Sequence, residues 1–255
     1  MLTVVIPILN QYKISAEALN LAIQNSVLND VEFIVIDNGS SEGEKPFSEA
    51  INAYVIDWEG LRKNKGLRII RNPENTGNYP IFKQGLKEAK GDIIAFFHCD
   101  LFVFEKGYDK RIVDTFANDE KLGLIGFIGS NEIDNFAGRG MGTCSNFAGR
   151  THKDWTGSRA EVHGRRITGI EPAAIVDGCS MIFRKKALEE IGFIEDWPLH
   201  HFYDRLMSAQ IIEKGWRIIT MGIECDHISG QVANQESKYH ETADKWMKQY
   251  YSNIE

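Results

Sequence analysis

Short apolar runs, separated by segments with helical spacing, make up the first half of the chain. These runs span residues 4–6, 31–37, 67–70, 91–103 and 122–128. Runs that are apolar at nearly every position indicate strands covered on both faces, and the apolar spacing within residues 19–27 indicates a helix. Because parallel neighbours require crossover helices, this alternation predicts an α/β fold with an open, mostly parallel sheet flanked by helices.

Polar residues follow the predicted strands. We expect Pro7 to end the first strand because it has no N–H for a central ladder. Asp37 ends the second run, residues 75–78 follow the third, and Asp100 lies in the fourth. Ligands bind beyond the carboxyl ends of such strands, so these residues should face one crevice. A buried unpaired carboxylate is costly, so Asp100 should face a cation, a ligand or water; capping of the next turn is the alternative.

The stretch from about residue 130 to residue 171 differs from the rest of the chain. It is rich in Gly, Ser, Asn and Arg and lacks sustained apolar periodicity. Its basic residues include Arg139, Arg150, Lys153, Arg159, Arg165 and Arg166. This irregular insertion is either a solvated surface loop or a site that holds an anionic acceptor or phosphates.

Regular structure is expected to resume after the insertion. A strand is predicted at residues 173–183, with a break at Gly178, followed by a helix at 185–191 and a last strand at 216–221. Residues 237–251 have the pattern of an amphipathic helix, which could pack on the body, pair with another chain or touch a membrane surface.

Composition and charge narrow the function classes. The apolar fraction of 43% and charged fraction of 25% are ordinary for a globular protein, and the formal charge of -7 argues against a protein that mainly coats nucleic acid. No apolar stretch is long enough for a membrane span, and the N-terminus lacks the pattern of a signal peptide, so we expect a cytoplasmic protein, with peripheral membrane attachment as an alternative. The four cysteines form no C-x-x-C pair and are expected to be reduced, half-buried thiols.

Four separated segments resemble, in order, those of family-2 glycosyltransferases with the GT-A fold. The first reads Val-Val-Ile-Pro-Ile-Leu-Asn at 4–10, and the second reads Ile-Val-Ile-Asp-Asn-Gly-Ser at 34–40. The third runs from Asn72 to His98-Cys99-Asp100, and the fourth covers 177–195. Each motif is weak alone, but a chance match of all four in this order and spacing is improbable.

The resemblance implies a single GT-A domain with a Rossmann-like sheet and a smaller acceptor-side half. Residues 1–104 would form the nucleotide-sugar-binding half, and residues 105–236 the acceptor and catalytic half with the insertion. Residues 237–255 would form a C-terminal helix. The donor would be a nucleoside-diphosphate sugar, most simply a UDP- or GDP-sugar, and the acceptor hydroxyl is left open.

The resemblance also implies three roles at the reaction centre. Asp100 would bind Mn²⁺ or Mg²⁺, His227 would complete the metal or diphosphate site, and Asp204 would be the catalytic base. The alternatives are a hydrogen-bonded turn histidine for His227 and a helix N-cap for Asp204. Two departures stand out, because many relatives have Asp-x-Asp where this chain has His98-Cys99-Asp100, and Glu-Asp where it has Tyr203-Asp204.

Donor-binding residues are implied at the ends of the first four strands. They are Pro7, Asn10, Asp37, Asn75, Gly77, Asn78 and Asp100. Asp37 would accept a hydrogen bond from a base N–H, or else form an Asx-turn after its strand. Gly77 would permit close backbone approach to the donor, or serve an ordinary turn.

The leading hypothesis is therefore a metal-assisted glycosyltransferase that inverts the anomeric carbon, with Asp204 as base. A retaining enzyme stays open as an alternative. The missing acid at position 98 and the missing Glu at position 203 also allow a nucleotide-sugar-binding module without activity. A nucleotidyltransferase on a similar sheet is a third reading.

Overall fold

The computed structural model describes residues 1–41, 49, 66–130, 143–144, 165–194 and 202–228. A central eight-stranded sheet has the order β10-β13-β6-β12-β4-β1-β2-β3. Its strands are β1 (Leu2–Ile8), β2 (Val31–Asn38), β3 (Arg68–Asn72), β4 (Ile93–Phe97), β6 (Leu122–Gly126), β10 (Ile170–Ala173), β12 (Ser180–Arg184) and β13 (Arg217–Met221). Only β10 and β12 run antiparallel to their neighbours in this sheet. The predicted α/β class with a mostly parallel sheet is confirmed.

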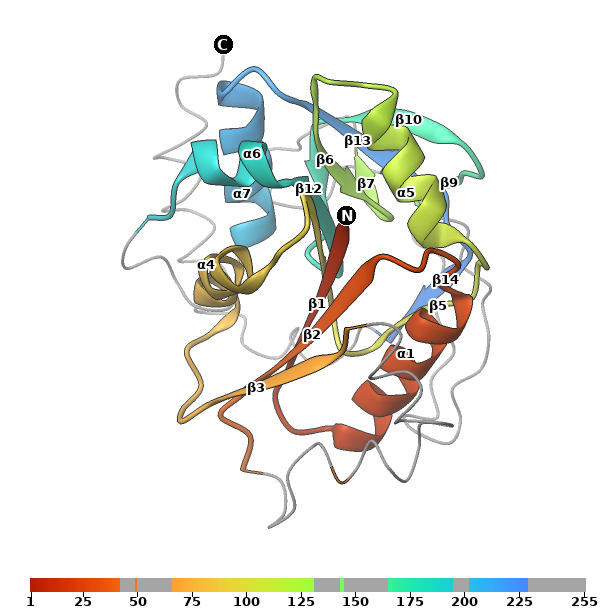
Figure 1. The fold of residues 1–255 in the computed structure, drawn as a ribbon. Coiled ribbons are helices and arrows are strands. Elements are labelled where there is room, and N and C mark those ends of the chain that lie inside the picture. Colours follow the sequence, from red (N-terminus) through yellow and green to blue (C-terminus); the bar gives the residue numbers. More distant parts are fainter. Residues whose placement is uncertain (42–48, 50–65, 131–142, 145–164, 195–201, 229–255) are drawn as a thin grey trace.

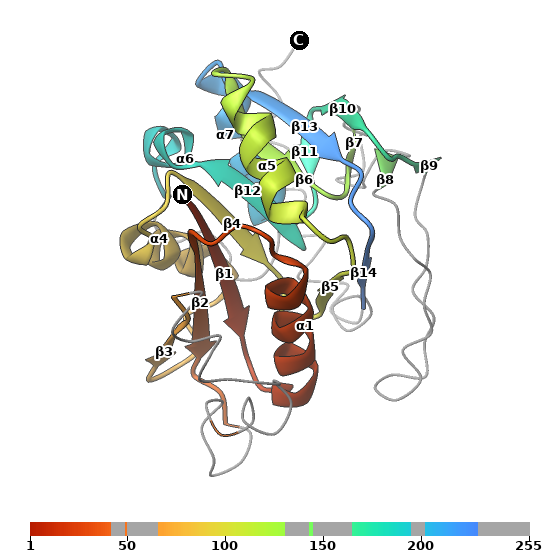
Figure 2. The same cartoon turned by 45° about the vertical axis from the view of Figure 1, so that its right-hand side comes forward.

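The direction of strand addition reverses next to β1. The chain proceeds from β1 to β2 and β3 on one side, then returns to place β4 on the other side of β1. These four strands are parallel, so their carboxyl ends lie along one edge of the sheet, toward which the arrows of β1 and β2 point in Figure 2. A reversal of this kind opens a crevice at the carboxyl ends of the two central strands.

Helices cover both faces of the sheet. Helices α1 (Tyr12–Asn25) and α5 (Tyr108–Ala117) lie on one face, and α4 (Asn78–Glu88), α6 (Lys185–Ile191) and α7 (Tyr203–Glu213) on the other (Figure 1). Alternate side chains of β1 point to opposite faces of the sheet. Leu2, Val4 and Ile6 join the core cluster under α1 and α5, and Val5 joins the cluster under α4, α6 and α7.

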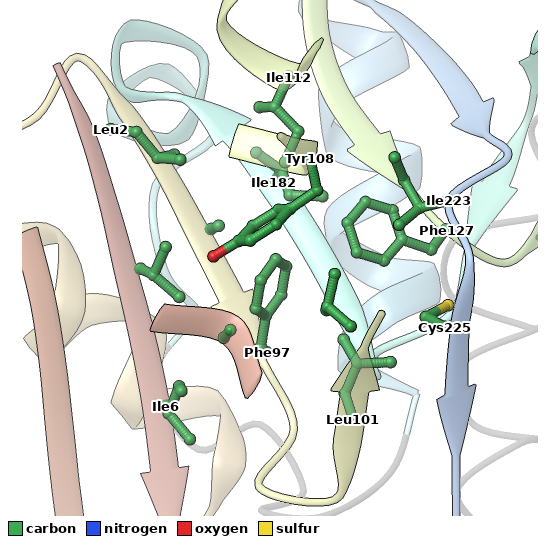
Figure 3. Close-up of a cluster of buried hydrophobic side chains, with 14 of the residues drawn as sticks. Leu2, Ile6, Phe97, Leu101, Tyr108, Ile112, Phe127, Ile182, Ile223 and Cys225 are labelled. Carbon is green, nitrogen blue, oxygen red and sulfur yellow. The ribbon is translucent and has the colours of Figure 1, made fainter. Parts of the chain in front are cut away.

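The core under α5 is built from large apolar side chains. Tyr108 and Phe97 lie side by side there, with ring centroids 6.1 Å apart (Figure 3). Phe97 is the last residue of β4, so this packing fixes the point at which the chain leaves the sheet.

Two smaller sheets lie beside the main one. Strand β5 (Leu101–Val103) pairs antiparallel with β14 (Cys225–His227). The other small sheet has the order β11-β7-β8-β9 and contains β7 (Gly129–Ser130), β8 (Thr143–Cys144), β9 (Arg165–Arg166) and β11 (Ile175–Val176). The sequence pattern did not predict β14, because three residues are too few to show a periodicity.

Several predicted boundaries need correction. Strand β1 continues through Pro7 to Ile8. Its last pair with β4 is at Val5, so at Pro7 the strand has a ladder neighbour only in β2 and tolerates a residue without an N–H. The run at 91–103 is two strands, β4 and β5, separated by a turn at 98–100. The run at 173–183 likewise forms separate strands, with the predicted break at Gly178 preceding β12, whereas the helix at 185–191 is confirmed.

Other predictions are tested only where the structure describes the chain. Cys99, Cys179 and Cys225 are free, as predicted, but the latter two are fully buried rather than half-buried. Most of the basic insertion and the predicted helix at 237–251 lie outside the described residues. Within the described part of the chain, no helix combines the length and the apolar character needed to cross a bilayer.

Candidate active site

A tight turn follows β4 and carries two polar side chains. The Leu101 N–H donates to the His98 carbonyl oxygen over 3.1 Å, which closes a β-turn with Cys99 and Asp100 in its centre. The His98 N–H donates to the Cys179 carbonyl oxygen over 2.9 Å. The turn is therefore held from within and from the segment that precedes β12.

Strand β14 brings a third polar side chain to this turn. His227 lies opposite Leu101 in the β5–β14 pair. The Nε2 atom of His227 is 3.2 Å from Asp100 Oδ1 and 3.3 Å from His98 Nδ1. One ligand atom from each of the three residues lies within 4.8 Å of the others. We call His98, Asp100 and His227 the histidine–aspartate cluster.

The cluster has the charge and donor atoms of a cation site. Burial would raise the pKa of Asp100, but the hydrogen bond from His227 and the charges of His227 and His98 together hold that pKa below its usual value. Asp100 therefore offers an ionised oxygen at neutral pH. Carboxylate and imidazole groups are both ligands of divalent cations, so the residues present fit a metal ion.

The start of α7 places Tyr203 and Asp204 beside the cluster. Phe202 has a left-handed backbone conformation (φ 59°) and precedes the first helical residue, Tyr203. The Tyr203 hydroxyl is 2.8 Å from His98 Nε2. Asp204 Oδ2 accepts a hydrogen bond from the Gly178 N–H over 3.3 Å. Asp204 lies within the first turn of α7, where a carboxylate is favoured by the helix dipole, and it is not the N-cap.

Residues 177–179 join Asp204 to the histidine–aspartate cluster. Gly178 contacts Asp204, and Cys179 contacts His98 through the backbone. Asp177 and Cys179 also have ligand atoms within 4.8 Å of His227, which gives a second possible metal group. Cys179 is fully buried, and burial, with the nearby Asp177, raises the pKa of its thiol well above the usual range. A neutral thiol is a weak ligand, so the histidine–aspartate cluster is the better cation site.

A separate polar network forms around Asp37 at the end of β2. Asp37 is buried, and its Oδ1 accepts the Ser40 N–H over 3.0 Å. Its Oδ2 accepts the Tyr12 hydroxyl over 3.0 Å and lies 3.6 Å from Arg71 Nη1. Asn10 joins the same loops, because its N–H donates to Ser40 Oγ and its side chain accepts the Ser41 N–H. Asp37 thus holds the turn after β2, which is the structural alternative considered from the sequence.

Asn38 connects the loops after β2 and β3. Its side-chain amide donates to Asn75 Oδ1 over 3.0 Å and to the Gly77 carbonyl over 3.3 Å. Its side-chain oxygen accepts from Asn72 and from both the N–H and the hydroxyl of Thr76. Gly77 has a φ of 83°, which favours glycine, and precedes Asn78, the first residue of α4. We call these Asp37- and Asn38-centred contacts the loop network.

The structure divides the sequence-predicted site residues between these two places. Asp100, His227 and Asp204 gather at the turn after β4 and the start of α7. Pro7, Asn10, Asp37, Asn75, Gly77 and Asn78 lie at the ends of β1–β3, along the same edge of the sheet. Sequence reasoning missed His98 and Tyr203 as members of the site. Their positions in the motifs could have indicated a role in the site, since both residues replace acids that many relatives carry there.

The sequence matches the model of a family of sugar-transferring enzymes. The chain belongs to glycosyl transferase family 2, whose family model matches residues 3–192. The matched part includes the loop network and the turn with Asp100, and it ends before Asp204 and His227. The family resemblance seen in the sequence is confirmed.

Solved structures with a similar fold include two glycosyltransferases. The mannosyltransferase PcManGT from Pyrobaculum calidifontis, in complex with GDP-Man and Mn²⁺, has a TM-score of 0.62 and 19% identity over 91% of this chain and 58% of that one. S. aureus TarS 1-349 in complex with UDP-GlcNAc has a TM-score of 0.58 and 17% identity over 93% of this chain and 61% of that one. This chain therefore spans about three fifths of each neighbour's length. A search of curated proteins gave no match.

Proposed function

We propose that the protein transfers a sugar from a nucleoside-diphosphate sugar to an acceptor hydroxyl, with a divalent cation at the histidine–aspartate cluster. The observation that carries this proposal is the convergence of His98, Asp100 and His227 at the carboxyl end of β4, in a chain of glycosyl transferase family 2. The ligands named for its neighbours, GDP-Man with Mn²⁺ and UDP-GlcNAc, support a donor of this class.

The donor is proposed to lie along the sheet edge between the two polar regions. The loop network would shape the nucleotide pocket, with Pro7, Asn10 and Asp37 on the base side and Asn75, Gly77 and Asn78 toward the ribose and phosphates. The base N–H would bond to Asp37 Oδ2, where it competes with the Tyr12 hydroxyl that occupies this oxygen. The diphosphate would reach the turn that carries Asp100.

The residues of the cluster and of α7 divide the chemistry. A divalent cation held by the cluster would neutralise the charge that develops on the leaving diphosphate. Asp204 is the proposed base, which takes the proton from the acceptor hydroxyl as that oxygen attacks the anomeric carbon. Its hydrogen bond from Gly178 fixes the carboxylate close to residues 177–179, which also contact the cluster. A single base opposite the leaving group implies inversion.

Calorimetry with a panel of nucleoside diphosphates, with and without MnCl₂, tests this proposal. We expect one nucleotide class to bind the native protein more tightly with Mn²⁺, and Asp100→Ala to lose the gain from Mn²⁺. Asp92→Ala is the matched control, because Asp92 is an exposed acid that precedes the first residue of β4, at the end of the strand away from Asp100. The proposal fails if no nucleoside diphosphate binds in the presence of Mn²⁺, or if Asp100→Ala binds as tightly as the native protein.

A second candidate function is a nucleotide-sugar-binding module without transfer activity. The replacement of two motif acids by His98 and Tyr203 favours it. Release of nucleoside diphosphate from the donor separates the two, since slow hydrolysis by the native protein that stops in Asp204→Asn requires a working site. A donor that binds but is never hydrolysed or transferred would favour the binding module.

A further inference from the structure

We propose that His98 is a third ligand of the cation and that Tyr203 orients it, so that the site has two imidazoles and one carboxylate and prefers Mn²⁺ to Mg²⁺. This deepens the proposed function and rests on it only in that the cation takes part in donor binding.

The separations between ligand atoms are those of neighbouring positions around one cation. Atoms at about 2.1–2.2 Å from a metal lie about 3.0–3.1 Å apart when they occupy adjacent octahedral positions. The Nε2 atom of His227 is 3.2 Å from Asp100 Oδ1 and 3.3 Å from His98 Nδ1. All three ligand atoms lie within 4.8 Å of one another, so the three residues could hold one ion.

Tyr203 is placed to hold His98 in the form that can bind a metal. A neutral imidazole carries its proton on one nitrogen and a lone pair on the other. The Tyr203 hydroxyl lies 2.8 Å from His98 Nε2. In the proposed metal-binding form, the proton is on Nε2 and is donated to the tyrosine oxygen. The lone pair then falls on Nδ1, which faces His227. Hydrogen bonds of this kind to the distal nitrogen are a general feature of metal-binding histidines.

His98 and Tyr203, the two residues that depart from the family motifs, therefore form one structural unit. His98 and Tyr203 are 105 positions apart in the chain, yet their side chains are hydrogen-bonded. Gly178 belongs to the same unit, because a Cβ atom at this position would lie 2.3 Å from the Tyr203 hydroxyl oxygen. The loss of an acid at position 98 is thus matched by a tyrosine that fits only beside a glycine.

Two imidazole ligands change the preferred cation. Mg²⁺ favours oxygen ligands and releases its water reluctantly, whereas the affinity of sites with nitrogen ligands rises along the order Mn²⁺, Fe²⁺, Co²⁺. Exchange of a carboxylate for His98 also removes one negative charge from the site, which weakens the attraction for a hard ion. We therefore expect Mn²⁺ and its spectroscopic substitute Co²⁺ to bind far more tightly than Mg²⁺.

Titration of the nucleotide-free protein with Mn²⁺, Co²⁺ and Mg²⁺ tests the proposal directly. His98→Ala and Tyr203→Phe should each weaken Mn²⁺ binding, by about 10- to 100-fold and about 10-fold respectively. Pulsed EPR of bound Mn²⁺ should show coordinated nitrogen from two imidazoles in the native protein and from one in His98→Ala. Tyr108→Phe is the matched control, because the buried Tyr108 hydroxyl has no hydrogen-bond partner among the described residues. It should leave Mn²⁺ binding unchanged.

His98→Asp is the test of selectivity, because it restores the acid that many relatives carry. The ratio of Mn²⁺ to Mg²⁺ affinity should fall about 10-fold or more in this variant. Melting temperatures of all variants show whether each remains folded, and His98→Gln provides a second variant of similar size to the native residue.

Three outcomes would overturn the proposal. The first is equal Mn²⁺ affinity in the native protein, His98→Ala and His98→Gln. The second is a nitrogen signal in His98→Ala like that of the native protein. The third is loss of the ion only in Cys179→Ala, which would place it at Asp177, Cys179 and His227. The proposed function fails separately, through absence of nucleoside diphosphate binding, and metal titration without nucleotide does not depend on that result.

Discussion

The loop network and the histidine–aspartate cluster lie along the same sheet edge but use their polar groups differently. In the loop network, donors and acceptors match: Asp37 accepts from Tyr12 and Ser40, and Asn38 both donates and accepts. In the cluster, two ring nitrogens and a carboxylate oxygen converge within 4.8 Å, and the nitrogens of His98 and His227 face each other. Matched groups hold the chain in shape, whereas two imidazole nitrogens and a carboxylate oxygen that converge are also the ligand atoms of a cation.

This difference predicts separate effects of mutation in the two regions. Changes near the cluster should reduce transfer with little effect on folding. Changes in the loop network should reduce the free energy of unfolding, and they should reduce donor binding only through the shape of the pocket. Each of the following variants tests one side of this comparison.

The largest effect is expected for Asp204→Asn, which keeps the size of the side chain but removes the base. Loss of general base catalysis costs about 10²- to 10⁴-fold, so sugar transfer measured by nucleoside diphosphate release should fall by that factor. Donor affinity should stay within about twofold of the native value, because Asp204 contacts residues 177–179 rather than the loop network. A variant that retains more than a tenth of the native rate would remove Asp204 from the proposed mechanism.

An intermediate effect is expected for Asn38→Ala, which deletes the side chain that connects the loops after β2 and β3. Several bonds are lost at once, and we expect the free energy of unfolding in urea to fall by about 2–3 kcal/mol. Mn²⁺ affinity should not change, because none of these bonds involves the cluster. Weaker Mn²⁺ binding in this variant, with the fold intact, would contradict the separation of the two regions.

The smallest effect is expected for Tyr12→Phe. This variant loses one hydrogen bond to Asp37, which keeps its contacts with Ser40 and Arg71. The free energy of unfolding should therefore fall by about 1 kcal/mol.

The effect of Tyr12→Phe should also depend on pH. Burial raises the pKa of the Tyr12 hydroxyl, the hydrogen bond with Ser40 opposes this shift, and Asp37 adds to it. A raised pKa in the folded state gives stability that is present below about pH 10 and is lost at higher pH. The difference between the variant and the native protein should thus be constant near neutral pH and shrink above about pH 10. A difference that grows there would show the opposite shift.

The proposed contact between the donor base and Asp37 predicts how Tyr12→Phe should affect nucleotide binding. If the base N–H competes with the Tyr12 hydroxyl for Asp37 Oδ2, Tyr12→Phe should bind nucleotide as tightly as the native protein or more tightly, despite its lower stability. Weaker nucleotide binding would show that Tyr12 itself contacts the donor. Calorimetry at neutral pH with Mn²⁺ present distinguishes these results.

Periodicity predicted most strands of the main sheet and the helices between them, but not β10, which begins within the stretch predicted to be an irregular insertion. Buried strands such as β2 and β4 are apolar along nearly their whole length, and the crossover helices between them carry apolar residues at helical spacing. The placement of Asp37 and Asp100 at one edge followed from the parallel order alone. The family resemblance then identified which acids to associate with a nucleotide and a metal.

Contacts between distant segments could not be predicted in the same way. The chain order does not show that β14 returns to pair with β5, so the meeting of His227 with the turn was visible only through family likeness. From the sequence, His98 and Tyr203 were seen only as replacements of acids that many relatives carry. Their hydrogen bond depends on the position of α7 relative to β4, which is set by core packing across the whole domain.

The pairing of β5 with β14 has a consequence for how the protein is assembled. His98 and His227 are 129 positions apart, so the cluster forms only when the chain between β4 and β14 has brought its two ends together. An ion bound there would tie the two ends of that long segment together and stabilise the folded state by about 2.7 kcal/mol at a hundred times its dissociation constant. Added Mn²⁺ would then raise the melting temperature, and a chain that ends before β14 would gain nothing from it.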